Sequence, residues 1–182
     1  MTKLSFFTDE DVEAIVSLPY RVGMHVSFAE DEEGEVDDER EMRALELCIK
    51  EIARVHEGEE LTKEIASAIL SSRGKWSNWS EGVFNIEPQC EKAIMALKTQ
   101  AGKEEVKDYI KMTLDIASSV AQAYGEFGEE QKEKGFFGKV MGGIVSSVAG
   151  VSADDANHPM NVSAAEDTAI SNIAQSLKKA AA

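Results

Sequence analysis

The chain has 182 residues, of which 43% are hydrophobic and 29% are charged, a composition typical of soluble globular proteins built as one domain with at most a short appendage. Its 34 acidic residues outnumber its 19 lysines and arginines, and the formal net charge is −15. Nonspecific binding to nucleic acid or to anionic lipid needs a positive surface, so this charge argues against both.

The first segments of the chain have helical periodicity, and the same spacing of apolar residues recurs in nearly every later segment. This pattern predicts an all-α fold of about seven helices. Thr8 and Asp11 have the spacing of a capped helix start and open the first helix. Because Pro19 has no amide hydrogen, we expect that helix to break there, with a second helix running from Pro19 to about Ala29.

The middle of the chain predicts four further helices. Their approximate ranges are 38–57, 59–73, 87–99 and 103–124. The intervening sequence GKWSNWSEGVFNIEP, residues 74–88, predicts a loop with hydrophobic anchors. Its Trp76 and Trp79 either form a platform on which a ligand stacks or serve as buried anchors, and anchors are the commoner outcome.

The C-terminal part begins with an apolar run, GFFGKVMGGIVSSVAGV, at 135–151. This run is shorter than the roughly 20 residues that cross a bilayer, and a lysine interrupts it. We therefore expect a helix that packs through its small residues rather than a membrane span. Ser163 and Glu166 form a capping box for a last helix. The chain thus divides into a helical domain over 1–150 and a linker with a C-terminal helix over 151–182.

Two acidic turns resemble each other. The first lies in AEDEEGEVDDERE, residues 29–41, which holds nine carboxylates in thirteen positions. GEVDDE at 34–39 and GEFGEE at 125–130 share the pattern Gly-Glu-apolar-any-acid-acid, and each follows a helix rich in small residues. We predict two pseudo-repeated helix–acidic turn–helix units packed as a compact bundle, in which Gly34 and Gly125 end the first helix of each unit.

These units resemble the TerB-like (tellurite-resistance) family. The matching segments are RVGMHVSFAEDEEGEVDDERE at 21–41 and DIASSVAQAYGEFGEEQKE at 115–133, and the resemblance covers about residues 10–140. Glu33 and Tyr124 stand where that family usually has an aspartate. The resemblance implies a small cytoplasmic helical protein of the stress response, without established catalysis, whose acidic turns bind metal ions.

The side-chain chemistry of the acidic turns also permits a divalent-metal site. Residues 31–42 lack the glycine and the final glutamate at the positions that an EF-hand loop requires. A looser site for Ca²⁺, Mg²⁺ or Zn²⁺ would draw on carboxylates of both turns: Asp31, Glu33, Glu35, Asp37, Asp38, Glu126 and Glu129. Two alternatives stay open, a solvated acidic surface and an acidic face that docks a basic protein partner.

Other kinds of site find little support. No GxSxG, GxxxxGK[ST], GxGxxG or HExxH motif occurs, so we expect neither catalysis nor a cofactor other than a metal. His25 is expected in the helix before the first acidic turn, and His56 at a helix C-terminus, where the dipole favours it. Cys48 and Cys90 form no CxxC motif. The N-terminal MTKLSFFTDEDVE lacks the apolar run of a secretory signal, which favours the cytoplasm.

Overall fold

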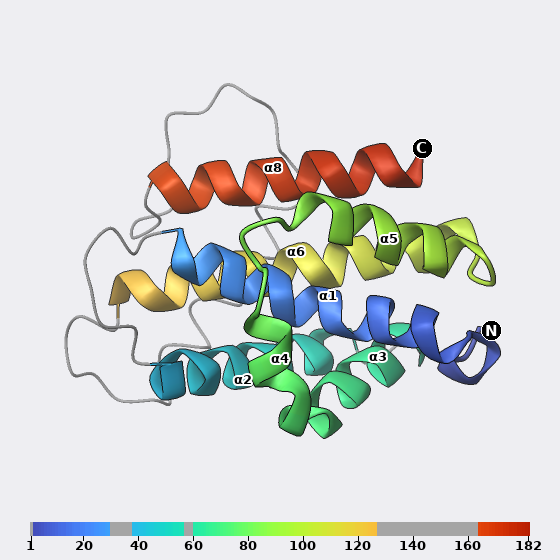
Figure 1. The fold of residues 1–182 in the computed structure, drawn as a ribbon, viewed down its shortest axis with the longest axis horizontal. Helices are drawn as coiled ribbons and strands as arrows, with labels where there is room; N and C mark the ends of the chain where they lie inside the picture. Colours follow the sequence, from blue (N-terminus) through green and yellow to red (C-terminus); the bar gives the residue numbers. More distant parts are fainter. Residues whose placement is uncertain (1, 30–37, 57–59, 127–163) are drawn as a thin grey trace.

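A computed structural model describes residues 2–29, 38–56, 60–126 and 164–182. These residues form seven α-helices and two short 3₁₀ helices, with no strand among them, which confirms the predicted all-α fold (Figure 1). In chain order the elements are η1 Leu4–Phe6, α1 Asp9–Phe28, α2 Asp38–Val55, α3 Glu60–Ser71, η2 Arg73–Lys75, α4 Trp76–Ser80, α5 Glu87–Lys98, α6 Lys103–Glu126 and α8 Ala164–Ala181.

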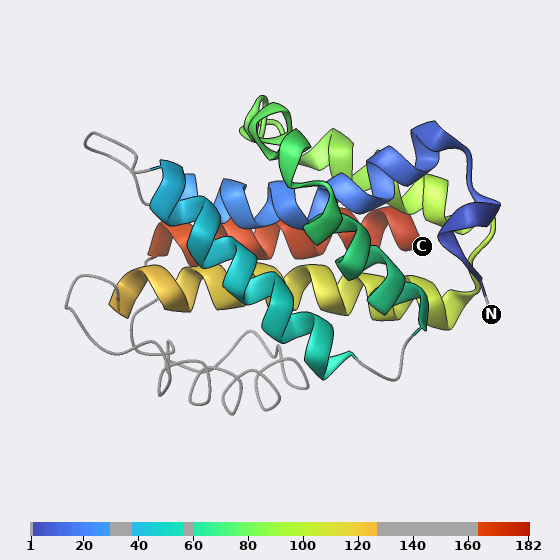
Figure 2. The ribbon, with the colours of Figure 1, turned by 90° about the horizontal axis from the view of Figure 1, so that it is seen from below.

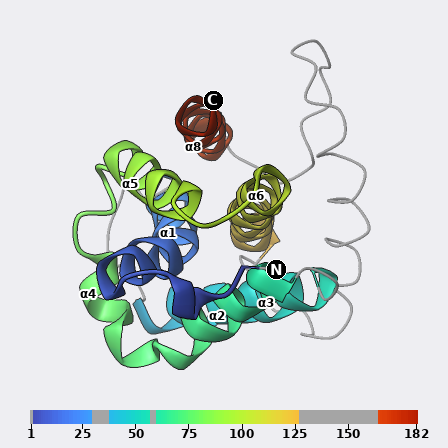
Figure 3. The same cartoon turned by 90° about the vertical axis from the view of Figure 1, so that its right-hand side faces the viewer.

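Helix α1 is the central element of the bundle. It contacts every other described α-helix, and the end-on view shows α5 and α4 to one side, α6 to the other and α2 with α3 beneath (Figure 3). Because neighbours surround it, all residues from Ile15 to Tyr20 are buried, and they do not form a single apolar stripe. Thr8 caps its start by accepting a hydrogen bond from the amide of Asp11 at 3.2 Å, as predicted.

Pro19 lies inside α1, which continues without interruption to Phe28. The prediction of two helices separated at Pro19 is therefore wrong. A proline within a helix leaves the carbonyl four residues earlier without its usual donor, and here that carbonyl belongs to Ile15. The hydroxyl of Tyr109 on α6 donates to the oxygen of Ile15 at 2.8 Å. A tertiary contact thus replaces the missing helical hydrogen bond, and this contact cannot be recognised from local sequence.

Gly23 permits close packing of α1 against α2. A Cβ atom added at Gly23 would lie 2.5 Å from Cδ1 of Leu45 and 3.5 Å from Cγ2 of Ile116. Leu45 is only 1% exposed, so its side chain has little room to move away. The absence of a side chain at Gly23 is therefore a packing requirement of the three-helix contact between α1, α2 and α6.

The segment that follows α3 is more ordered than the sequence predicted. Residues expected to form a loop instead fold into η2 and the short helix α4. Trp76 and Trp79 are 3% and 2% exposed, which confirms that they act as buried anchors. The Nε1 group of Trp76 donates to the carbonyl of Ile69 at 3.1 Å and ties the end of α3 to α4.

The C-terminal helix α8 lies on the side of the bundle opposite α2 and α3 (Figure 3). Helix α8 runs along α5 and α6 and buries Ala169, Ile173 and Leu177 against them (Figure 3). Helix α6 passes through Gly125 and ends at Glu126, so the prediction that Gly125 ends this helix is wrong. Gly125 is therefore the second-last residue of the helix and not the residue that follows its end.

Several other predicted features lie outside the described residues. These are Gly34, the apolar run 135–151 and the capping residue Ser163. Residues 34–37 and 127–130 of the two acidic turns are also among them, and the pseudo-repeat stays a prediction.

The N-terminal residues are fixed to the start of α6 by one carboxylate. Glu105 accepts hydrogen bonds from the amide and the hydroxyl of Thr2, at 2.9 and 2.8 Å, and from the amide of Gly102 at 2.8 Å. Partial burial acts to raise the pKa of Glu105, but these hydrogen bonds outweigh it and hold the pKa below its ordinary value. The N-terminus is therefore held most firmly when Glu105 is ionised.

Candidate functional site

The two acidic turns belong to segments that leave from one end of the helical bundle. We call residues 30–37 the first acidic segment and the residues that follow Glu126 the second. Helix α1 ends at this end and α2 begins there, while α6 ends and α8 begins at the same end (Figures 1 and 2). The two chain termini lie toward the opposite end (Figure 1). We call the end of the bundle marked by Phe28, Asp38, Glu126 and Ala164 the acidic end. The fold therefore attaches the two acidic segments to a common face, although long stretches of sequence separate them.

The structure does not describe the predicted metal ligands as a group. Asp31, Glu33, Glu35, Asp37 and Glu129 lie outside the described residues. Asp38 and Glu126 are the first residue of α2 and the last residue of α6, and only their backbone is described. Within the described part of the chain, no group of three or more His, Cys, Asp or Glu side chains could hold a metal ion.

A buried pair of titratable side chains joins α6 to the end of α2. Nε2 of His56 lies 3.0 Å from Oδ2 of Asp115, and the two side chains are 1% and 2% exposed. The other oxygen of Asp115 and Oγ of Ser119, one turn later, are buried and have no hydrogen-bond partner among the residues that the structure describes. Such low exposure separates the pair from solvent, so we interpret it as a structural link between the two helices.

The sequence interpretation missed this pair. His56 was expected to be stabilised by the helix dipole alone, whereas it is buried against a carboxylate. The available signal was Asp115 and Ser119, two polar residues four apart among the buried residues of α6. That signal identifies a polar contact on α6 but not its partner on the distant α2.

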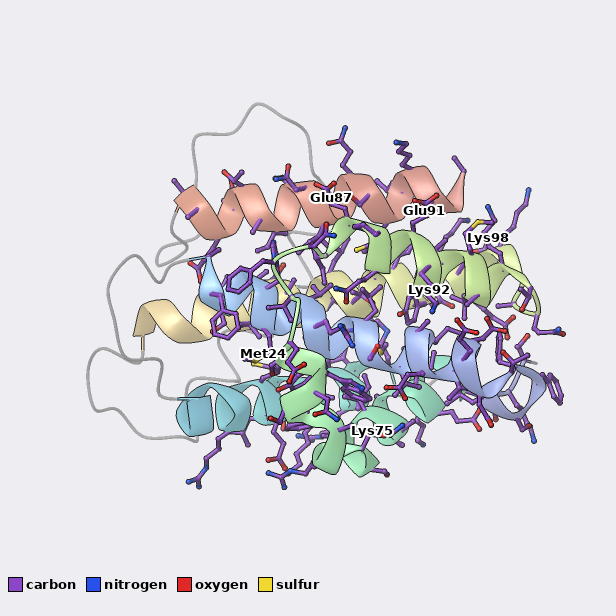
Figure 4. All side chains as sticks on the ribbon, viewed as in Figure 1. Met24, Lys75, Glu87, Glu91, Lys92 and Lys98 are labelled. Carbon is purple, nitrogen blue, oxygen red and sulfur yellow. The ribbon has the colours of Figure 1, made fainter. Side chains whose placement is uncertain are left out.

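A second polar cluster fixes α4 to the first half of α1. Glu13 accepts hydrogen bonds from Nε1 of Trp79 at 2.6 Å and from Nζ of Lys75 at 2.7 Å. Lys75 is labelled in Figure 4. Partial burial acts to raise the pKa of Glu13, but these two donors and the positive charges of Lys75 and Arg21 lower it overall. Beside them the rings of Tyr20 and Trp76 stack with centroids 4.8 Å apart. The buried tryptophans are thereby fully engaged in packing.

The segment between α4 and α5 is fixed against α1 by polar contacts. Nδ1 of His25 lies 2.8 Å from the carbonyl oxygen of Val83. Gln89 donates from Nε2 to the carbonyl of Gly82 at 3.0 Å and accepts from Nη1 of Arg21 at 2.9 Å. His25 was predicted to lie near the first acidic turn, and its described role is to position this segment.

Neither cysteine has the properties of a reactive site. Cys48 and Cys90 are free thiols, and both are buried in the core. Burial raises the pKa of each thiol to about 12. Because the thiolate is the nucleophile and the metal ligand, neither side chain supplies one at neutral pH.

The described helices include none that is both long enough and apolar enough to span a bilayer.

Comparisons with known proteins give no family assignment. No family model, curated protein or solved structure matches the chain.

Proposed function

We propose that the chain is a non-enzymatic, TerB-like protein of the stress response, akin to tellurite-resistance proteins, that binds divalent cations at its acidic end in the cytoplasm. The observation that carries this proposal is the common attachment of both acidic segments to one end of the bundle. The first segment alone, residues 30–37, contains six carboxylates and no basic residue. Carboxylates at this density repel one another, and a bound cation relieves that repulsion.

The chemistry of the proposed ligands indicates which cations to expect. Asp and Glu supply only oxygen donors, which suit Ca²⁺ and Mg²⁺, whereas Zn²⁺ sites in proteins mostly include histidine or cysteine. His25, the histidine nearest in sequence to the first acidic segment, already has Nδ1 against the carbonyl of Val83. We therefore expect the affinity for Ca²⁺ or Mg²⁺ to be higher than the affinity for Zn²⁺.

Isothermal titration calorimetry of the full chain tests the proposal. We expect saturable binding of Ca²⁺ or Mg²⁺ below millimolar concentration, and loss of that binding when Asp31, Glu33, Glu35 and Asp37 are all changed to Asn or Gln. A matched variant in which exposed acids elsewhere, such as Glu60 and Glu104, are neutralised should bind as the wild type does. If the titration shows no heat of binding below millimolar cation concentration, the proposed metal binding is ruled out.

A second function, docking of a basic protein partner at the acidic end, is favoured by an exposed aromatic side chain. Phe84 is 78% exposed and its ring stacks on that of Phe28, the last residue of α1. Docking through charge predicts binding that weakens with added salt and is indifferent to chelators. Charge reversal at Glu35, Asp37 and Asp38 should abolish it, whereas a metal-mediated contact would be lost on adding EDTA.

A further inference from the structure

Helix α8 lies at the edge of the bundle, on the side opposite α2 and α3 (Figure 3). It begins at the end of the bundle where α6 ends, but residues 127–163 separate the two helices along the chain (Figure 1). The position of α8 therefore depends on how its side chains pack and not on a short connection to α6.

The packing of α8 is confined to one stripe of the helix. Its buried residues are Glu166, Ala169, Ile173 and Leu177, which lie three or four residues apart and so share one face. All other residues of α8 are at least partly exposed. Helix α1, in contrast, is buried on all sides over Ile15–Tyr20. Because hydrophobic stabilisation grows with the apolar area that is buried, α8 is held in the bundle much less firmly than α1.

The surface that α8 covers is formed by α1, α5 and α6. Lys98, the last residue of α5, is labelled in Figure 4. Its Nζ donates to the carbonyl oxygens of Ala180 and Ala181 at 3.3 and 3.2 Å. Carbonyls in the last turn of a helix have no donor within the helix, so this contact recognises a helix end and fixes the direction of α8. We call the covered surface, together with Lys98, the α8 site.

The helices beneath α8 are joined to one another by contacts that do not involve it. Tyr109 on α6 donates to the carbonyl of Ile15 on α1, and His56 at the end of α2 lies against Asp115 on α6. These contacts stay in place when α8 leaves. Parts of a protein that have few buried contacts open at a lower free-energy cost than the whole molecule unfolds.

We propose that α8 is a separable helix that undocks while α1 to α6 stay folded, and that the α8 site then accepts α8 of a second copy of the chain. The second copy fits because its α8 has the same stripe of Ala169, Ile173 and Leu177 and the same terminal carbonyls for Lys98. Exchange of identical helices forms a dimer without any new kind of contact. The chain between α6 and α8 is long enough to connect two copies, since extended chain spans about 3.3–3.6 Å per residue.

The helix that belongs to the same chain competes with the helix of the second copy. Its covalent attachment gives it a high effective concentration at the α8 site. The site is therefore open to the second copy only in the fraction of molecules whose own α8 has undocked, and the apparent affinity is reduced by that fraction.

Hydrogen exchange of the full chain, followed by mass spectrometry, tests the undocking. We expect the amides of α8 to be protected at least about tenfold less than those of α1 and α6. Leu177→Ala should lower the protection of α8 at least about tenfold further and leave that of α1 and α6 unchanged. Leu61→Ala is the matched control, because Leu61 is also buried but lies on α3; it should leave the protection of α8 unchanged. Equal protection of α8, α1 and α6 in the wild type overturns the proposal.

Fluorescence anisotropy with a labelled synthetic peptide of residues 164–182 tests the α8 site. Ile173→Asp in the full chain places a charge in the buried stripe and should keep that chain's own α8 undocked. We expect this variant to bind the peptide at least about tenfold more tightly than the wild type does. Asn172→Asp is the matched control, because it adds the same charge at the neighbouring exposed position; it should bind the peptide as the wild type does.

Two further results decide the outcome. Equal binding of the peptide by the wild type and by the Ile173→Asp chain, or no binding by that variant, overturns the site for a second copy. Loss of amide protection in α1 and α6 of the Ile173→Asp chain shows that α8 belongs to the common core, and it overturns the proposal as a whole. Metal binding at the acidic end is independent of either result.

Discussion

The hydrogen bond from Tyr109 to Ile15 is expected to be a major contribution to the stability of the central helix. Pro19 leaves the carbonyl of Ile15 without a helical donor, and the buried hydroxyl of Tyr109 supplies one at 2.8 Å. Burial also raises the pKa of Tyr109 well above its ordinary value, so the hydroxyl stays protonated and able to donate at neutral pH. Tyr109→Phe removes the donor with almost no change in shape, and leaving a buried carbonyl unpaired costs about 1–3 kcal/mol. We therefore expect the free energy of unfolding to fall by about 2 kcal/mol.

A double-mutant cycle with Pro19→Ala tests this reasoning directly. Alanine at position 19 restores an amide that can donate to the carbonyl of Ile15, so Tyr109→Phe should then cost less than about 1 kcal/mol. Urea unfolding of the four proteins, followed by far-ultraviolet circular dichroism and by tryptophan fluorescence, measures the coupling. An equal loss in both backgrounds, or no loss from Tyr109→Phe in the wild type, would show that the hydroxyl does not compensate for the proline.

The remaining predictions concern packing, the buried pair and the N-terminus. Gly23→Ala should lower the free energy of unfolding by about 1 kcal/mol, because overpacking outweighs the gain in helix propensity. Gly74→Ala is the control and should not destabilise the protein, because a Cβ added there meets no atom within 4 Å. Equal effects of the two substitutions in thermal melts would contradict the packing argument. His56→Ala and Asp115→Ala should each cost about 3–5 kcal/mol, because each leaves a buried polar partner, and the double variant should cost less than their sum in urea unfolding. Folding lowers the pKa of Glu105, so the carboxylate contributes to stability above its unfolded pKa, near 4.5, and this contribution is lost as the pH falls through the lower folded value. Glu105→Gln should therefore reduce the free energy of unfolding at pH 7 and flatten the decline of stability at acid pH. An unchanged decline at acid pH would refute the linkage.

Local sequence patterns were sufficient to predict the helices that have a capping motif or a regular spacing of apolar residues. Thr8 and Asp11 marked the start of α1, and the apolar periodicity located α2, α3, α5 and α6. These signals depend on residues within a few positions of each other. They succeed because the capping hydrogen bonds and the buried stripe of a helix are local consequences of its sequence.

The predictions that failed depended on contacts between distant segments. Pro19 was expected to end a helix because its sequence neighbours do not include Tyr109, which lies on α6. His56 lies at a helix end as expected, but its burial against Asp115 was missed because Asp115 is far away in sequence. The exposure of Phe84 likewise follows from how its segment is fixed on α1. The acidic end itself was predictable only in part, because the sequence identifies both acidic segments but not that their flanking helices share one end.

The most direct test of the central claim is a Ca²⁺ titration of the isotope-labelled full chain followed by amide chemical shifts in nuclear magnetic resonance. If cations bind at the acidic end, saturable shifts below millimolar Ca²⁺ should be concentrated at the helix ends that flank the acidic segments, including the amides of Ala29, Asp38 and Glu126. Shifts that do not saturate, or that are concentrated at the opposite end near Lys98 and Glu105, would contradict the claim.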